Sequence, residues 1–158
     1  MTEKEMFLNS YEREFEITLA FLDAMPAGSL DFRPYPNLQS AQELAWSFAQ
    51  EERVFIEGAL DGDVVFKRNP APDTFEGIRS QYYTNHLRLV ERINALPDGA
   101  FDEAVTFGSG MAGAKRMRRG DVLWLAVMDA VHHRGQFSVY IRMTGGNVPP
   151  LRTAPGEI

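Results

Sequence analysis

Asp129 and His133 are the residues whose types and spacing most clearly suggest chemistry. Residues four apart share one face of a helix, so the two side chains point the same way, and Gln136 and Tyr140 follow on that stripe. The stripe also carries apolar residues, and an unpaired carboxylate or imidazole within it would cost several kcal/mol. A divalent metal ion would supply the partner, because Asp and His one helical turn apart can ligate the same ion. The alternative is a buried Asp–His hydrogen bond that only fixes helix packing.

The helix that must position these residues is expected to run from Asp121 to Met143 and to end at Gly145-Gly146. It is apolar on nearly every side, from Val122 through Ile141. A helix without a clean polar side is buried on more than one face. In a small domain the second face often meets another subunit, so the sequence predicts a homodimer.

Three further helices are predicted from their start signals. Thr2 and Ser40 each stand three residues before a glutamate, which is the capping-box arrangement, and Asp73 begins a looser version of it. Apolar residues with helical spacing follow each start. The expected helices end near three breakers: Pro26, Gly62 and Pro97. The predicted fold class is all-α, with a rigid, proline-containing crossover at residues 26–39 between the first and second helices.

The connection before the last helix, residues 101–120, is rich in glycine and basic residues, with a short extended piece expected at 104–107. Residues 108–113, GSGMAG, match the dinucleotide string G-x-G-x-x-G. That motif works only where a strand turns directly into a helix inside a βαβ unit, so a mobile loop is the better interpretation. The basic run 115–119 would attract an anion or a nucleic acid, but in an acidic chain a solvated entry to the last helix is favoured.

The composition fits a single domain over residues 1–158, with 44% hydrophobic and 24% charged residues. A net charge of −6 argues against nucleic-acid binding, because phosphate neutralisation needs a surplus of Lys and Arg. The absence of cysteine excludes disulfides, thiolate ligands and a cysteine nucleophile. Met1–Tyr11 has no continuous apolar run, and no stretch approaches the roughly 20 apolar residues that span a bilayer. We therefore expect a cytoplasmic protein that binds neither nucleic acid nor membranes.

Residues 129–150, DAVHHRGQFSVYIRMTGGNVPP, resemble the C-terminal signature of the DinB superfamily. Phe32-Arg33-Pro34 and residues 40–46, SAQELAW, extend the resemblance into the first half of the chain. The resemblance implies a four-helix bundle with a long crossover between the first and second helices, and frequent dimerisation. It also implies a divalent-metal site in the bundle core, with one ligand from the second helix and two from the fourth.

Carried over residue by residue, His133 matches the last ligand and Asp129 the ligand before it, where relatives carry His or Asp. Ser47 occupies the position at which the second helix normally supplies a histidine. Serine is a poor ligand because its neutral hydroxyl is a weak donor to a divalent ion. Glu51, one turn beyond Ser47, and His86, on the apolar stripe of the third helix, are candidates to replace that histidine. Each has an alternative interpretation without a metal. Glu51 would reach the edge of the bundle or form an ion pair with an arginine, and His86 would be a hydrogen-bonded core residue.

Two functional hypotheses remain open, and with them the question of whether the protein is an enzyme. In the first, zinc, nickel, iron or manganese activates a small thiol or water, as the resemblance to metal-dependent transferases, isomerases and hydrolase-like relatives implies. The glycine-rich loop at 108–119 would then be a lid. The side chains expected to orient a small-molecule ligand are Arg134, Gln136 and Tyr140. In the second, the protein is a catalytically inactive, metal-free, homodimeric binding or stress-associated protein with a buried Asp129–His133 pair.

Overall fold

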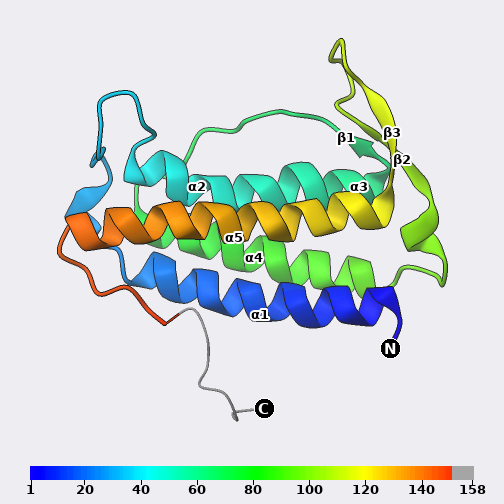
Figure 1. Ribbon diagram of the computed structural model, residues 1–158, viewed down its shortest axis with the longest axis horizontal. Helices are drawn as coiled ribbons and strands as arrows, with labels where there is room; N and C mark the ends of the chain where they lie inside the picture. Colours follow the sequence, from blue (N-terminus) through cyan, green and yellow to red (C-terminus); the bar gives the residue numbers. More distant parts are fainter. Residues whose placement is uncertain (151–158) are drawn as a thin grey trace.

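The computed structural model describes residues 1–150 and consists mainly of long helices, with a small sheet at one end (Figure 1). The long helices are α1 (Glu3–Asp23), α2 (Ala41–Glu51), α4 (Phe75–Asn94) and α5 (Arg119–Met143). Helix α2 continues directly into a π-helical turn, η2 (Glu52–Glu57), and then α3 (Gly58–Asp61). The connections contain two short 3-10 turns, η1 (Ala27–Ser29) and η3 (Ala100–Asp102). The last eight residues of the predicted single domain, 151–158, lie outside the described part.

Side-chain caps begin the first helices where the sequence predicted them. Thr2 and Ser40 each accept a hydrogen bond from the backbone N–H three residues later, and the glutamate there completes a capping box. The third predicted start was wrong by one residue, because Thr74 rather than Asp73 caps α4. Helix α5 begins at Arg119, two residues earlier than expected, and ends at the predicted residue.

The helices pack as a bundle in which α1 and α2 each contact both α4 and α5. Apolar side chains fill the space between them in two clusters. The phenylalanines at positions 7, 21, 48 and 137 are at most 1% exposed, and burying each such ring stabilises the fold by about 1.5–3 kcal/mol. Within residues 1–150, no helix combines the length and the apolar character that crossing a membrane requires.

A three-stranded sheet at one end of the bundle corrects the all-α prediction. It consists of β1 (Asp63–Val64), β2 (Ala104–Phe107) and β3 (Lys115–Arg118), in the order β1-β2-β3. Strand β2 is parallel to β1 and antiparallel to β3. The extended piece expected at 104–107 is β2. The sheet was not predicted, because strands of two to four residues are too short to show an alternating pattern in the sequence. The fold is therefore mainly helical with a small sheet.

The glycine-rich segment 108–113 forms the connection of the β2–β3 hairpin. Gly108 and Gly110 both have a φ of 79°, in the left-handed region that favours glycine. Strand β2 thus leads into another strand rather than into a helix. This is the geometry of a hairpin connection and not of a dinucleotide-binding turn.

The basic run at 115–119 is not simply a solvated helix entry, as the sequence suggested. Its first residues form β3. An Nη1 atom of Arg118 lies 2.7 Å from the carboxylate of Glu3 in α1. Arg119 is 8% exposed and its Nη1 lies 2.8 Å from Glu103. These ion pairs use the last two cations of the run to attach the sheet to the bundle.

Candidate metal centre

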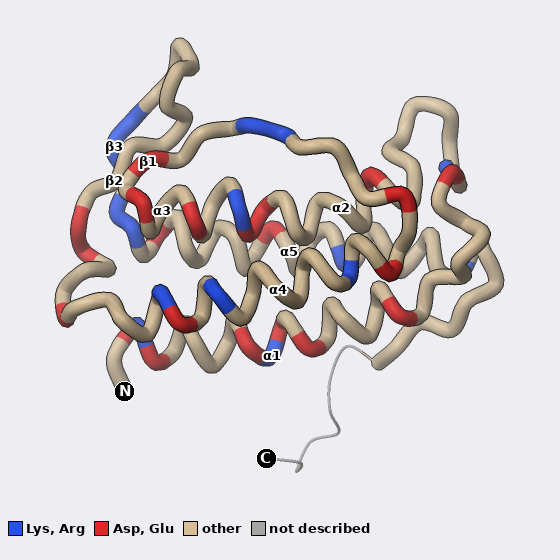
Figure 2. The backbone as a smooth tube through the Cα atoms, turned by 180° about the vertical axis from the view of Figure 1, so that it is seen from behind, with Lys and Arg blue, Asp and Glu red and all other residues tan. Residues whose placement is uncertain are grey.

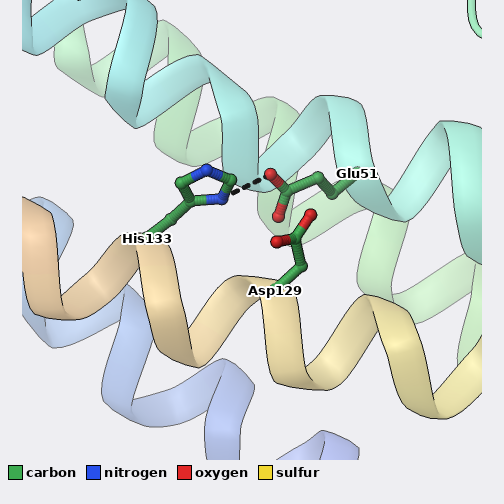
Figure 3. A group of neighbouring side chains, drawn as sticks. All are labelled: Glu51, Asp129 and His133. Carbon is green, nitrogen blue, oxygen red and sulfur yellow. Dashed lines mark ion pairs between the residues drawn. The ribbon is translucent and has the colours of Figure 1, made fainter.

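Glu51, Asp129 and His133 bring three metal-binding side chains together between two packed helices (Figure 3). Each offers one ligand atom, a carboxylate oxygen or an imidazole nitrogen, and these atoms all lie within 4.8 Å of one another. Glu51 comes from the end of α2, whereas Asp129 and His133 come from α5. Oxygen and imidazole ligands of this kind suit first-row divalent metals.

The local backbone explains how these side chains meet. Asp129 and His133 lie one turn apart on α5 and therefore share its face, as the sequence predicted. Glu51 is the last α-helical residue before the π-helical turn η2, a type of distortion that is frequent at functional sites. Glu51 is only 9% exposed, and the side chain of His133 is 19% exposed. Glu51 and His133 are thus held largely out of water, and Asp129 is partly buried.

The electrostatics of the group centre on the contact between Glu51 and His133. Oε1 of Glu51 lies 2.5 Å from Nδ1 of His133, but that nitrogen is not oriented for a hydrogen bond. The polar contact with Glu51 raises the pKa of His133 more than partial burial lowers it. Burial raises the pKa of Glu51, and the contact with His133 only partly opposes this rise. Both groups therefore hold a proton more readily than they would in water.

A pocket of about 610 Å³ opens beside the three residues, which is within the size range of small-molecule sites. Glu51, Asp129 and His133 are part of its wall. The other lining residues come from the end of the first crossover, α2, η2 and the segment after β1: Gln39, Glu43, Trp46, Ser47, Gln50, Val54, Phe55, Phe66, Lys67 and Arg68. A ligand in this pocket would lie directly against the metal-binding group.

Ser47 lines the pocket but is not part of the group of three ligand atoms. Its hydroxyl donates to the backbone carbonyl of Glu43 at 3.2 Å, the local hydrogen bond that serine commonly makes within a helix. Glu51, one turn further along α2, offers a carboxylate oxygen close to Asp129 and His133, which Ser47 does not. The sequence had named Glu51 and His86 as alternatives for this role.

His86 lies elsewhere in the bundle and does not join the group. Its ring stacks on Phe15 with the centroids 3.6 Å apart, and it is 2% exposed. Its Nδ1 lies 3.5 Å from Oε1 of Glu52. Burial lowers the pKa of His86 from 6.5 to about 4, so the ring is neutral at pH 7. His86 is therefore a core histidine, but not the hydrogen-bonded one that the sequence suggested, because neither ring nitrogen has a hydrogen-bond partner within residues 1–150.

Arg134, expected to orient a ligand, is buried on the other side of α5. It is 4% exposed, and its Nη2 lies 2.5 Å from the carboxylate of Glu14. A second guanidinium nitrogen donates to the hydroxyl of Thr18 at 3.3 Å. Arg134 thus joins α5 to α1 and does not face the pocket.

Gln136 and Tyr140 also contribute nothing to the pocket wall among the described residues. Gln136 is exposed, with its amide nitrogen 3.1 Å from a ring nitrogen of His132. Tyr140 donates its hydroxyl to the backbone carbonyl of Gln39 at 2.8 Å, which supports one end of the pocket from behind. The loop at 108–119, expected to be a lid, likewise supplies no lining residue.

The segment after β1, residues 65–74, was missed by sequence reasoning although it forms one side of the pocket. We call it the strap, because it runs alongside α2 and connects β1 to α4 (Figure 1). Its lining residues are Phe66, Lys67 and Arg68. Pro70 and Pro72 are the signal that could have indicated an extended, ordered segment here.

A mainly helical bundle with a carboxylate–histidine group facing a pocket defines the general class of this protein. The sequence profile of the DinB family matches residues 1–155, and the chain belongs to that family. Among solved structures, a DinB-like protein from Bacillus cereus has a TM-score of 0.80 at 26% identity, covering 94% of this chain and 97% of the other. A DinB-like protein from Bacillus subtilis has a TM-score of 0.74 at 16% identity, covering 92% and 96%. No curated protein gave a significant match.

Proposed function

We propose that this protein binds one divalent metal ion through Glu51, Asp129 and His133 and uses it to activate a small thiol or water. The observation that carries the proposal is the convergence of their ligand atoms within 4.8 Å at the wall of a ligand-sized pocket. Three protein ligands beside an open pocket are the usual arrangement of a catalytic metal, which keeps a position free for substrate.

The residues present fit such an ion. Oε2 of Glu51 and Nδ1 of His133 are buried and make no hydrogen bond, and buried polar atoms without partners are costly. A divalent ion would satisfy them and, when bound, would lower the pKa of a thiol or water in the pocket. Zinc, nickel, iron and manganese all accept carboxylate and imidazole ligands. The chain has no cysteine, so in thiol chemistry the thiol would come from the co-substrate.

One observation favours a metal-free binding protein as the second candidate. Glu51 and His133 already lie 2.5 Å apart, so a protonated His133 would neutralise the carboxylate without an ion. In that case His133→Ala should mainly lower the free energy of unfolding, by about 1–3 kcal/mol. For a metal site, the same change should remove the metal and leave the fold intact.

The first test is the metal content of protein produced without a histidine tag, measured by plasma mass spectrometry before and after reloading with each of the four metals. We expect close to one ion per chain, lost in Glu51→Gln and His133→Ala. Glu43→Gln is the matched control, because Glu43 lines the same pocket but lies outside the ligand group, and glutamine keeps its capping role. If metal is bound only after Ser47→His, the natural protein does not bind a metal ion, although the rest of the site still can, and the proposal is wrong.

We further propose that the protein is a homodimer formed through α5. Four exposed apolar side chains lie on one stripe of this helix: Met128, Val131, Val139 and Met143. A second copy would cover them by a two-fold contact of the same stripe. A sedimentation mass equal to one chain at micromolar concentration would overturn this part of the proposal.

A further inference from the structure

The strap presents two adjacent cations, Lys67 and Arg68, at the wall of the pocket. In Figure 2 the strap runs alongside α2, and its basic residues are drawn as a blue stretch. Both are exposed, and within residues 1–150 neither side chain forms an ion pair or a hydrogen bond. Arg33, by contrast, lies 2.9 Å from the Glu43 carboxylate. Lys67 and Arg68 therefore keep their positive charge available to a ligand.

The backbone on both sides of these cations is fixed. On the C-terminal side, the carbonyl of Asn69 accepts hydrogen bonds from the side chains of Trp46, at 2.9 Å, and Gln50, at 2.8 Å. On the N-terminal side, the ring of Phe66 contacts Phe55 edge to face, with the centroids 5.7 Å apart. Anchors on both sides reduce the backbone entropy that is lost when a ligand is bound.

The pocket also contains an apolar surface beside the cations. Phe66 remains 45% exposed although it packs against Phe55 and Phe107. Trp46, Val54 and Phe55 line the same pocket. An exposed aromatic ring next to charged groups at a pocket wall is typical of a site for an organic ligand with a polar end.

Arg68 lies in the same pocket wall as the metal-binding group. Arg68, Glu51 and His133 all line the one pocket of about 610 Å³. A single small molecule in this pocket would therefore contact both Arg68 and Glu51. A ligand with its reactive end at Glu51 would have Arg68 within reach of a second group.

From this geometry we infer that the pocket binds small organic carboxylates, with the carboxylate at Lys67 and Arg68 and the apolar body against Phe55 and Phe66. The inference rests on the proposed function, because it describes the substrate class of the same site. It predicts that the thiol or hydrolysable substrate carries a carboxylate away from its reactive end. Charge-assisted hydrogen bonds to arginine and lysine would fix the orientation of that substrate.

The test compares two probes with the same carbon skeleton, hydrocinnamate and hydrocinnamyl alcohol. Binding is followed by NMR through the indole N–H of Trp46, since the chain has two tryptophans and Trp46 lines the pocket. We expect the carboxylate to bind about three- to tenfold more tightly than the alcohol. The double variant Lys67→Gln/Arg68→Gln should lose this preference.

The matched control is Arg13→Gln/Arg142→Gln, which removes the same charge at two exposed positions outside the pocket and should keep the preference. An equal loss in both double variants would overturn the inference, because only the net charge would then matter. A preference that survives Lys67→Gln/Arg68→Gln but disappears on chelation would also overturn it, because the carboxylate would then bind the metal.

Each titration is run on zinc-loaded and on chelator-treated protein, so that the two proposals can fail separately. Preference for the carboxylate with no zinc binding would overturn the metal function and leave the carboxylate site standing. Zinc binding with no preference for the carboxylate would overturn the carboxylate site and leave the metal function standing.

Discussion

Two glutamate–histidine pairs start from adjacent residues of one helical segment and behave in opposite ways. In the outer pair, Glu51 faces His133 on α5 at the wall of the pocket. In the inner pair, Glu52 faces His86 on α4 inside the bundle. Successive helical residues point about 100° apart, so a step of one residue moves the carboxylate from the pocket to the core.

Burial disfavours the charged form of both partners of the inner pair. Complete burial raises the pKa of Glu52 well above its ordinary value, and burial lowers the pKa of His86 to about 4. The hydroxyl of Tyr11 donates to Oε1 of Glu52 at 2.5 Å. Out of water, the attraction between the two partners does not make up for their lost hydration.

The outer pair differs because it lies at the wall of the pocket. The contact with Glu51 raises the pKa of His133, whereas that of His86 is lowered. Asp129 adds a second carboxylate beside His133, as Figure 3 shows. Solvent access and an additional acidic neighbour thus separate a group suited to a cation from one suited only to packing.

The largest difference between the pairs is expected in stability. His86→Ala should lower the free energy of unfolding by about 2–4 kcal/mol, because it leaves a cavity beneath the stacked ring of Phe15. His133→Ala, at a half-buried position, should cost less than about 1 kcal/mol. Denaturant unfolding of both variants measures the comparison, and equal losses would show that the outer pair is also a packing element.

Metal affinity should show the opposite difference. Glu51→Gln should weaken zinc binding by about ten- to a hundredfold, since even outer-shell changes at metal sites often cost that much. Glu52→Gln, one residue away, should leave the affinity within about threefold. Calorimetric zinc titration of the two variants makes the comparison. A larger loss of zinc affinity in Glu52→Gln than in Glu51→Gln would place the metal at the inner pair and contradict the proposal.

The pH dependence of the free energy of unfolding should reveal the contribution of His86. His86 has a pKa of about 4 in the folded state and 6.5 in the reference state. Its contribution is therefore complete above pH 6.5 and is lost as the pH falls towards 4, whereas the raised pKa of Glu52 acts with the opposite sign. From pH 7 to 4, the wild type should lose about 1–2 kcal/mol more than His86→Gln. Parallel stability curves would contradict a neutral His86.

The smallest expected effect is on the titration of His133 in metal-free protein. NMR of its ring should give a pKa above the ordinary 6.5, because of the contact with Glu51. Glu51→Gln should move that pKa back towards 6.5 without unfolding the protein. Glu43→Gln, elsewhere in the pocket, should leave it unchanged, and an unchanged value in Glu51→Gln would show that the contact does not control His133.

Much of the helical framework could be predicted from the sequence, because capping residues and apolar spacing are local signals. The boxes at Thr2 and Ser40 and the shared face of Asp129 and His133 are of this kind. The sheet was missed because its strands have two to four residues, too few for a reliable alternation.

The choice between Glu51 and His86 could not be made from the sequence. Both lie on core-facing stripes, and which stripe meets α5 depends on how the helices rotate against one another. The prediction that Arg134 orients a ligand was wrong for the same reason, since its partner Glu14 is 120 residues away in the chain. The strap was missed because its contribution depends on how it lies against α2 in the folded protein.

Anomalous diffraction from crystals of the zinc-loaded protein, recorded at the zinc edge, tests the central claim most directly. We predict one peak within bonding distance of Glu51, Asp129 and His133, and none beside Glu52 and His86. A peak at the inner pair, or no peak at the outer group in fully loaded protein, would contradict the assignment of the metal to the outer pair.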